Sequence, residues 1–219
     1  MTTKNVTMLS KNEEDYLRRI YELQVKAGRS LRASEIADAL SVSTPSVSEM
    51  MRKMKKNGFV ENKRYGTISL TKKGADEARK ILRKHRILEV FFADLLGMKD
   101  TFHQEAHEIE HAISEKAELK LEKLLKNPKK CPDGDEIPPH GSRVISLSEA
   151  PLRTALRVLF TKLEKKDELA RIKSLGMNPG QKMHIVKRLS HGPLILRLKE
   201  SEVAIGKEIA SSVFVEVQK

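Results

Sequence analysis

The stretch LRASEIADALSVSTPSVSEMMRKM at residues 31–54 decides the fold of the N-terminal region. Apolar residues recur in it at helical spacing on both sides of a short interruption at residues 41–44. Pro45 falls in the first turn of the second segment, where a proline is tolerated, and Gly58 marks the end of that segment. The pattern predicts two short helices joined by a tight turn, which is a helix-turn-helix unit.

The residues around this unit extend the prediction to a winged helix. Residues 10–26 have apolar positions at helical spacing, and Ser10 with Glu13 forms a capping-box pattern at their start. Two short strands are predicted at residues 59–61 and 67–70. The basic tip NKRYG at residues 62–66 joins them into a hairpin, the wing.

The rest of the chain divides by composition into a helical and a β-rich part. Residues 75–126 predict two long helices separated near residues 97–100. Residues 127–142 contain four of the eight prolines and predict a linker. Several short strands around a helix at residues 165–175 predict a small β-barrel. The expected fold class is mainly α with a small β part, in domains of residues 1–74, 75–140 and 141–219.

Composition excludes several classes of protein. The chain has 219 residues and a formal net charge of +12. It contains no apolar run near the roughly 20 residues that span a bilayer, and its N-terminus lacks the apolar core of a secretory signal. Cys131 is the single cysteine, which excludes a disulfide framework and a zinc site made of cysteines alone. We therefore expect a soluble, cytoplasmic protein.

The uneven charge points to a polyanionic partner. Residues 1–74 carry 15 basic and 8 acidic residues, a net charge of +7. A basic helix-turn-helix segment favours DNA, with the second helix in the major groove, although a winged helix can also bind protein. The residues expected to contact base edges or phosphates are Arg32, Ser43, Thr44, Pro45, Ser46, Glu49, Lys53, Lys63 and Arg64.

Histidines and carboxylates in the middle of the chain predict metal binding. His103, His107, Glu110 and His111 fall on one helical face about 100° wide. The preceding helix adds the i, i+4 pair of His85 and Glu89, and the first helix carries Asp15. These donors suffice for two sites and suit Fe²⁺, Mn²⁺, Co²⁺, Ni²⁺ or Zn²⁺. The alternative is a solvated helix face with chance histidines.

A second alternative is enzymatic. Residues 107–111 fit the H-E-x-x-H pattern of zinc proteases, in which Glu108 would be the general base. Such an enzyme also needs a third ligand downstream and a substrate cleft, for which a segment of two helices leaves little room. Cys131 could supply a thiolate ligand, but a lone cysteine in a linker is usually incidental.

The order of these parts resembles the diphtheria-toxin-repressor family of metal-dependent transcriptional regulators. The resemblance covers nearly the whole chain and is best in EDYLRRIYEL (14–23), the helix-turn-helix stretch, RKHRILEVFFADLLGM (83–98) and HQEAHEIEHAIS (103–114). It implies a homodimer that binds operator DNA when Fe²⁺ or Mn²⁺ is bound and represses genes of metal homeostasis. It also implies an SH3-like (FeoA-like) domain at residues 141–219, and two-fold symmetry predicts an inverted-repeat operator.

The resemblance also implies ligand sets. One metal site is matched by His85, Glu89 and His103, and the other by Asp15, His107, Glu110 and His111. Glu168 lies near a position from which the C-terminal domain of iron-type members donates a ligand.

The sequence departs from both types of family member. Iron-type members usually have Met where Asp15 stands and Cys where His107 stands. Manganese-type members share the Asp at position 15 but have Glu where Arg18 stands and another Glu where His107 stands. Glu49 replaces a frequent Gln, which predicts a different operator sequence. The C-terminal domain favours Fe²⁺, with Mn²⁺ as the alternative.

Overall fold

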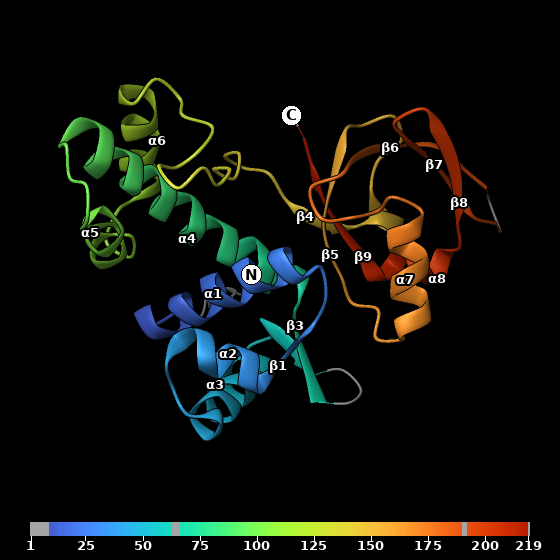
Figure 1. Cartoon of the computed structure of the whole chain (residues 1–219), viewed down its shortest axis with the longest axis horizontal. Helices are drawn as coiled ribbons and strands as arrows, with labels where there is room; N and C mark the ends of the chain where they lie inside the picture. Colours follow the sequence, from blue (N-terminus) through green and yellow to red (C-terminus); the bar gives the residue numbers. More distant parts are fainter. Residues whose placement is uncertain (1–8, 63–65, 190–191, 219) are drawn as a thin grey trace, which may run out of the picture. The chain divides into compact units, whose positions relative to one another are not determined.

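The computed structural model of the chain describes residues 9–62, 66–189 and 192–218 (Figure 1). The chain forms two compact units, each assembled from two separate segments. Unit 1 combines residues 1–18 with 77–140, and unit 2 combines residues 19–76 with 141–219. Helices α1 (Lys11–Ala27) and α4 (Lys72–Val90) therefore each contribute residues to both units.

Helix α1 begins at the capping box that the sequence predicts. The Ser10 N–H donates to Glu13 Oε2 at 3.0 Å, and the Glu13 N–H donates to Ser10 Oγ at 3.3 Å. These two bonds satisfy backbone donors that have no partner within the helix. Gly28, with a φ of +69°, follows the last helical residue and ends the helix in the left-handed conformation.

The predicted helix-turn-helix is confirmed. Helix α2 (Ala33–Leu40) is followed by Ser41, which has a φ of 54°, and by helix α3 (Thr44–Lys56). Ser43 caps α3 by accepting a hydrogen bond from the Ser46 N–H at 3.3 Å. Val47, Met51 and Met54 are the buried face of α3, so its opposite face remains exposed.

The wing contains one strand more than the sequence predicts. Strands β2 (Val60–Asn62) and β3 (Thr67–Leu70) form the expected antiparallel hairpin. Strand β1 (Leu31–Arg32) pairs antiparallel with the other side of β3, and two residues are too few to show a period in the sequence. The wing tip, residues 63–65, lies outside the described residues.

In unit 1, α4 continues into the π-helical segment η2 (Phe91–Leu95), followed by α5 (Phe102–Ile109) and α6 (Glu115–Leu124). The predicted single long helix after residue 100 is wrong, because it is broken at residues 110–114. Ser114 starts α6 by accepting a hydrogen bond from the Ala117 N–H at 3.2 Å. This local cap competes with continuation of α5.

The proline-rich segment 127–142 contains no helix and only an isolated bridge between Lys130 and Glu136, but it is packed rather than extended. Cys131 and Ile137 are buried against apolar residues of α4. Arg83 of α4 donates to the Pro138 carbonyl at 2.6 Å. These contacts hold the segment on unit 1.

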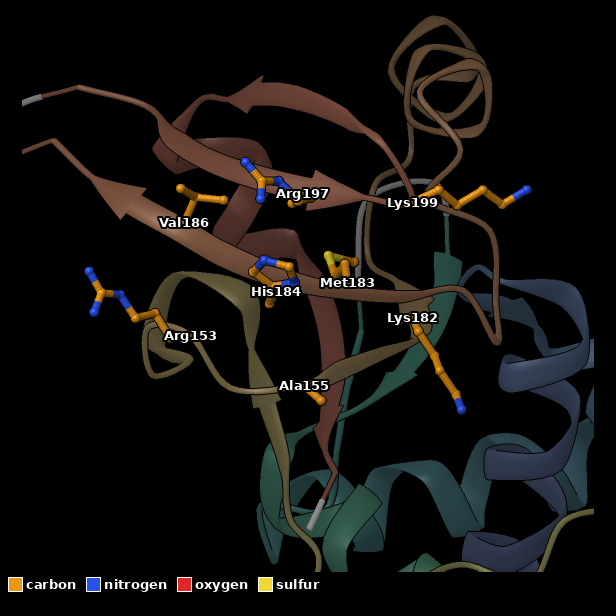
Figure 2. Close-up of a pocket in the computed structure, with 8 residues that line it drawn as sticks. All are labelled: Arg153, Ala155, Lys182, Met183, His184, Val186, Arg197 and Lys199. Carbon is orange, nitrogen blue, oxygen red and sulfur yellow. The ribbon is translucent and has the colours of Figure 1, made fainter.

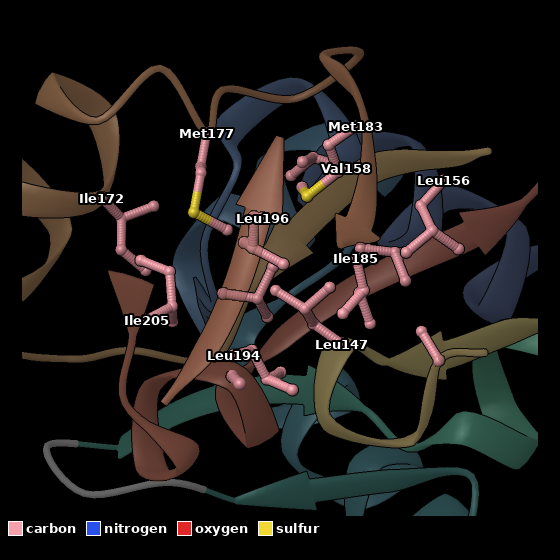
Figure 3. Packing of buried hydrophobic residues seen from close by; sticks show 14 of the residues in the cluster. Leu147, Leu156, Val158, Ile172, Met177, Met183, Ile185, Leu194, Leu196 and Ile205 are labelled. Carbon is pink, nitrogen blue, oxygen red and sulfur yellow. The ribbon is translucent and has the colours of Figure 1, made fainter. Parts of the chain in front are cut away.

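The C-terminal part of unit 2 is the predicted small β domain. Its elements are β4 (Val144–Ser146), η3 (Leu147–Glu149), β5 (Leu156–Thr161), α7 (Lys166–Ser174), β6 (Lys182–Arg188), β7 (Leu194–Leu198), β8 (Ser201–Ile205), α8 (Lys207–Ser212) and β9 (Val213–Val217). The strands pair antiparallel in the order β4-β9-β5-β6-β7-β8. Figure 3 shows their shared apolar core, in which Leu147, Leu156, Ile185 and Leu196 are fully buried.

Among the described residues, no helix is both long enough and apolar enough to cross a bilayer.

Candidate metal centres and DNA-binding surface

Four predicted ligands converge in unit 1. Ligand atoms of Asp15, His107, Glu110 and His111 all lie within 4.8 Å of one another, and we name these residues group A. His111 Nε2 is 3.0 Å from Asp15 Oδ1 and 3.4 Å from Glu110 Oε1. His107 Nδ1 is 3.1 Å from the same Glu110 oxygen. Two imidazoles and two carboxylates at these separations can surround one divalent cation.

Three ligands of group A lie at the end of α5 and in the turn that follows it. His107 lies in the last full turn of α5, and Glu110 is the residue that caps its C-terminal end. The Ala112 N–H then donates to the Ile109 carbonyl at 2.9 Å, a tighter turn than that of an α-helix. Asp15 comes from α1, so group A joins two helices far apart in the sequence.

Glu110 is fully buried and both its oxygens are engaged. Oε1 faces the histidines of group A, whereas Oε2 lies 2.6 Å from His85 Nδ1. Burial opposes ionisation of Glu110, but the hydrogen bond from His85 and the positive charge of Arg18 outweigh it and lower its pKa. Glu110 is therefore a buried carboxylate that its neighbours keep ionised.

His85, Glu89 and His103 form a second cluster, group B. Glu89 Oε1 is 3.1 Å from His85 Nε2 and 2.6 Å from His103 Nδ1. Burial opposes ionisation of Glu89, but its hydrogen bonds with the two histidines prevail and lower its pKa to about 2. Burial also disfavours the charged form of His85, but hydrogen bonds to Glu110 and Glu89 raise its pKa.

In each group one imidazole is held by a further carboxylate. Glu14 Oε2 lies 2.5 Å from His111 Nδ1, which leaves Nε2 of that ring facing Asp15. Glu110 holds Nδ1 of His85 in the same way, and Nε2 of that ring faces group B. Metal-binding histidines are typically oriented by a carboxylate on the opposite nitrogen, so this donor chemistry fits divalent cations.

Sequence reasoning missed the contacts of Glu14 and Arg18 at the groups, and it took Cys131 for an incidental residue of the linker. Glu14 orients His111, and Arg18 places its guanidinium against Glu110 and His107. Cys131 is buried beside Glu89, and burial together with the charge of Glu89 raises the pKa of its thiol to about 11. The contacts of Glu14 and Arg18 cross 97 and 89 residues of sequence, so no local pattern announces them.

The structure sorts the predicted ligands in two ways that helical spacing did not. His103 and His107 share a face of α5, yet His103 joins group B and His107 joins group A. Glu168 pairs with Lys165 at 3.1 Å in unit 2 and is in neither group. Its assignment as a ligand stays a prediction.

Glu108 does not support the protease alternative. Its side chain is exposed, and it belongs to neither group among the described residues. The base of an H-E-x-x-H site must reach the metal-bound water, which places it beside the ligands. The zinc-protease reading is therefore unsupported.

The predicted DNA-contacting residues lie on an exposed surface. Arg32 and the first residues of α3 are exposed, and Lys53 is exposed on the face opposite the buried methionines. The exposed residues of the prediction are Arg32, Ser43, Thr44, Pro45, Ser46, Glu49 and Lys53. Lys63 and Arg64 lie outside the described residues.

The C-terminal domain has a basic hollow of about 560 Å³ (Figure 2). It is lined by Arg153, Ala155, Lys182, Met183, His184, Val186, Arg197 and Lys199. The lining includes no carboxylate, so the hollow does not suit a metal cation.

The low pKa of Glu89 predicts a pH-dependent contribution to stability. Because this pKa is lowered from 4.5 to about 2, the ionised carboxylate stabilises the fold above about pH 4.5, and that contribution is lost as the pH falls toward 2. The shift corresponds to roughly 3 kcal/mol. We expect the free energy of unfolding of Glu89→Gln, measured with a chelator present, to fall less steeply than that of wild type across this range. If the free energies of unfolding of wild type and Glu89→Gln fell equally with pH, the lowered pKa could not belong to Glu89.

Comparison with known proteins bears on all three parts of the chain. Residues 8–68 match a family model described as the iron dependent repressor N-terminal DNA binding domain. Residues 71–139 match the iron dependent repressor metal binding and dimerisation domain, and residues 145–217 match the FeoA domain. The chain is 30% identical to the iron-dependent repressor IdeR of Mycobacterium tuberculosis over 221 residues, which cover 93% of this chain and 96% of that protein.

Two further similarities extend over nearly the whole chain. The diphtheria toxin repressor of Corynebacterium diphtheriae is 28% identical over 219 residues, covering 93% of this chain and 96% of that protein. Among solved structures, that of the manganese regulator SloR is 28% identical with a TM-score of 0.56, covering 96% of this chain and all of that one.

Proposed function

Since this chain belongs to the diphtheria-toxin-repressor family and is a metal-dependent, DNA-binding transcriptional repressor, we propose that groups A and B are its metal sites. The observation that carries this proposal is group A, in which Asp15 of α1 meets three ligands from residues 107–111. A cation bound there neutralises the converging carboxylates and cross-links the two segments. Binding can then favour the arrangement of α1 in which the ligands are closest.

The proposed cation is Fe²⁺, with Mn²⁺ as the alternative. Both groups offer imidazole nitrogens and carboxylate oxygens, a set that suits either ion. IdeR is an iron-dependent repressor and SloR is a manganese regulator, so relatives of both kinds resemble this chain. Anaerobic titration with each ion, followed by binding to genomic DNA fragments, decides between them. The ion that promotes specific binding at the lower free concentration is the activator.

We further propose that the chain binds as a homodimer to an inverted repeat that controls genes of metal homeostasis. The metal-binding and dimerisation family model covers residues 71–139. Within this range, large apolar side chains remain exposed at Leu95, Leu96, Ile109 and Leu124. Exposed leucines of this kind suit the contact between two copies. Two-fold symmetry would space the two α3 helices by one DNA turn or a multiple of it.

DNA-binding measurements should distinguish residues of α3 that contact phosphates from residues that contact bases. Lys53 is placed to contact phosphate, so Lys53→Ala should weaken binding to all sequences about equally and reduce the salt slope by roughly one unit. Glu49→Gln should instead change the preferred operator, because a carboxylate accepts from cytosine and an amide pairs with adenine. Fluorescence anisotropy at several salt concentrations distinguishes the two effects. Equal losses for both variants on every sequence would contradict the assignment of Glu49.

A further inference from the structure

Arg18 places a positive charge inside a set of proposed metal ligands. It lies one turn after Asp15 on α1, and 10% of its side chain is exposed. Its Nε is 3.2 Å from Glu110 Oε1, and one of its terminal nitrogens is 3.3 Å from His107 Nδ1. The guanidinium therefore contacts two of the four residues of group A.

Both contacts use atoms that a metal ion would need. Glu110 Oε1 is the oxygen that faces the two histidines of group A, whereas Oε2 is already taken by His85. A guanidinium can only donate hydrogen bonds, so His107 Nδ1 accepts from Arg18 in the tautomer in which it does not donate to Glu110. Arg18 thus lies against one inward-facing atom of each of two ligands.

The charge of Arg18 is permanent. A guanidinium is always charged in proteins, so Arg18 is a fixed positive charge at the site. A buried carboxylate such as Glu110 requires positive partners. His85 lies against Oε2, and either Arg18 or a divalent cation can supply the positive charge beside Oε1. Both together would place like charges on the same side of one carboxylate.

We propose that Arg18 is an internal competitor that sets the metal affinity of group A. Its guanidinium competes with the metal ion for Glu110 and His107, so a metal ion binds only by displacing it or by tolerating its charge. This proposal rests on the assignment of group A as a metal site. It makes Arg18 a determinant of the metal concentration at which the repressor responds.

The test is Mn²⁺ binding to the full chain, measured by anaerobic calorimetry. All variants carry His103→Ala, which removes a largely exposed ligand of group B so that group A is measured alone. We expect Arg18→Gln to bind Mn²⁺ at least about tenfold more tightly than its parent. Arg18→Lys, which keeps the charge, should gain less. Arg19→Gln is the matched control, because Arg19 carries the same charge one residue on but pairs with Glu22 at 3.3 Å.

Two further measurements keep the outcome decisive. Arg18→Met retains most of the aliphatic stem and serves as the second variant if Arg18→Gln does not fold. In Arg18→Ala, millimolar methylguanidinium should weaken Mn²⁺ binding again, whereas it should not affect the Arg19→Gln control. A residue that merely supported the fold would show neither effect.

The possible results distinguish the competitor role of Arg18 from the assignment of group A as a metal site. Unchanged or weaker Mn²⁺ binding in folded Arg18→Gln or Arg18→Met overturns the competitor role. If Glu110→Gln, tested in the same background, binds Mn²⁺ as tightly as its parent, the assignment of group A itself is wrong. Loss of binding in Glu110→Gln together with a gain in Arg18→Gln supports both.

Discussion

Replacing Glu110 by Gln should abolish metal-stimulated DNA binding. Its carboxylate is fully buried, joins the two histidines of group A through Oε1 and holds His85 through Oε2. An amide lacks the negative charge and offers an N–H₂ on one side, so one of these two contacts is lost in either orientation. Because loss of an outer partner typically costs 10–100-fold in metal affinity, loss of this ligand should cost at least about 100-fold.

Glu108→Gln is the matched control for that experiment. It makes the same chemical change two residues away, on an exposed side chain outside both groups. We expect its metal titration and its metal-dependent anisotropy with operator DNA to match those of wild type. Equal losses in the two variants would refute the ligand assignment. Metal-dependent peptide hydrolysis that disappears in Glu108→Gln would restore the protease reading.

Replacing His85 should weaken both groups, although less than the loss of Glu110 weakens group A. Its Nε2 belongs to group B, and its Nδ1 is held 2.6 Å from Glu110. We expect His85→Ala to remove binding at group B and to reduce the affinity of group A by about 10–100-fold, because Glu110 loses its orienting partner.

The comparison variant for His85 is His103→Ala. His103 belongs only to group B, and 61% of its side chain is exposed. It should remove binding at group B and leave the affinity of group A close to that of wild type. Calorimetry with Mn²⁺ at protein concentrations that resolve two steps measures both affinities. If group A bound Mn²⁺ with the same affinity in both variants, the contact between Glu110 and His85 would not couple the two groups.

The elements with local signals could be predicted from the sequence. The capping box of Ser10 and Glu13 predicts the start of α1, and the helical period on either side of residues 41–44 predicts α2 and α3. The sequence does not reveal the break before Ser114, because the apolar period continues across it, and only the Ser114 cap, which accepts from the Ala117 N–H, shows that a new helix begins. A periodic pattern reports which face is buried, not whether the backbone is continuous.

Residue types and helical spacing predicted the ligands, whereas their division into two groups came only from the family resemblance, and the structure brings the same residues together. Spacing placed His103 and His107 on one face of α5, which is correct. Their separation into two groups depends on which helix faces each of them, with α4 supplying Glu89 and α1 supplying Asp15. Contacts between segments so distant in the sequence are set by tertiary packing, and a single sequence does not record them.

The ligands of group A lie far apart in the sequence, and this has a consequence for the lifetime of the protein. His111 and Asp15 lie 96 residues apart in the chain, so the ligand set disperses whenever unit 1 unfolds. A metal ion that binds only the folded state adds RT ln(1 + [L]/Kd) to stability, about 2.7 kcal/mol at a hundredfold excess over Kd. Proteases degrade chains mainly from unfolded states, so starvation for metal should shorten the half-life of this repressor. The cell would then lose repression twice, once through release from the operator and again through a falling number of molecules.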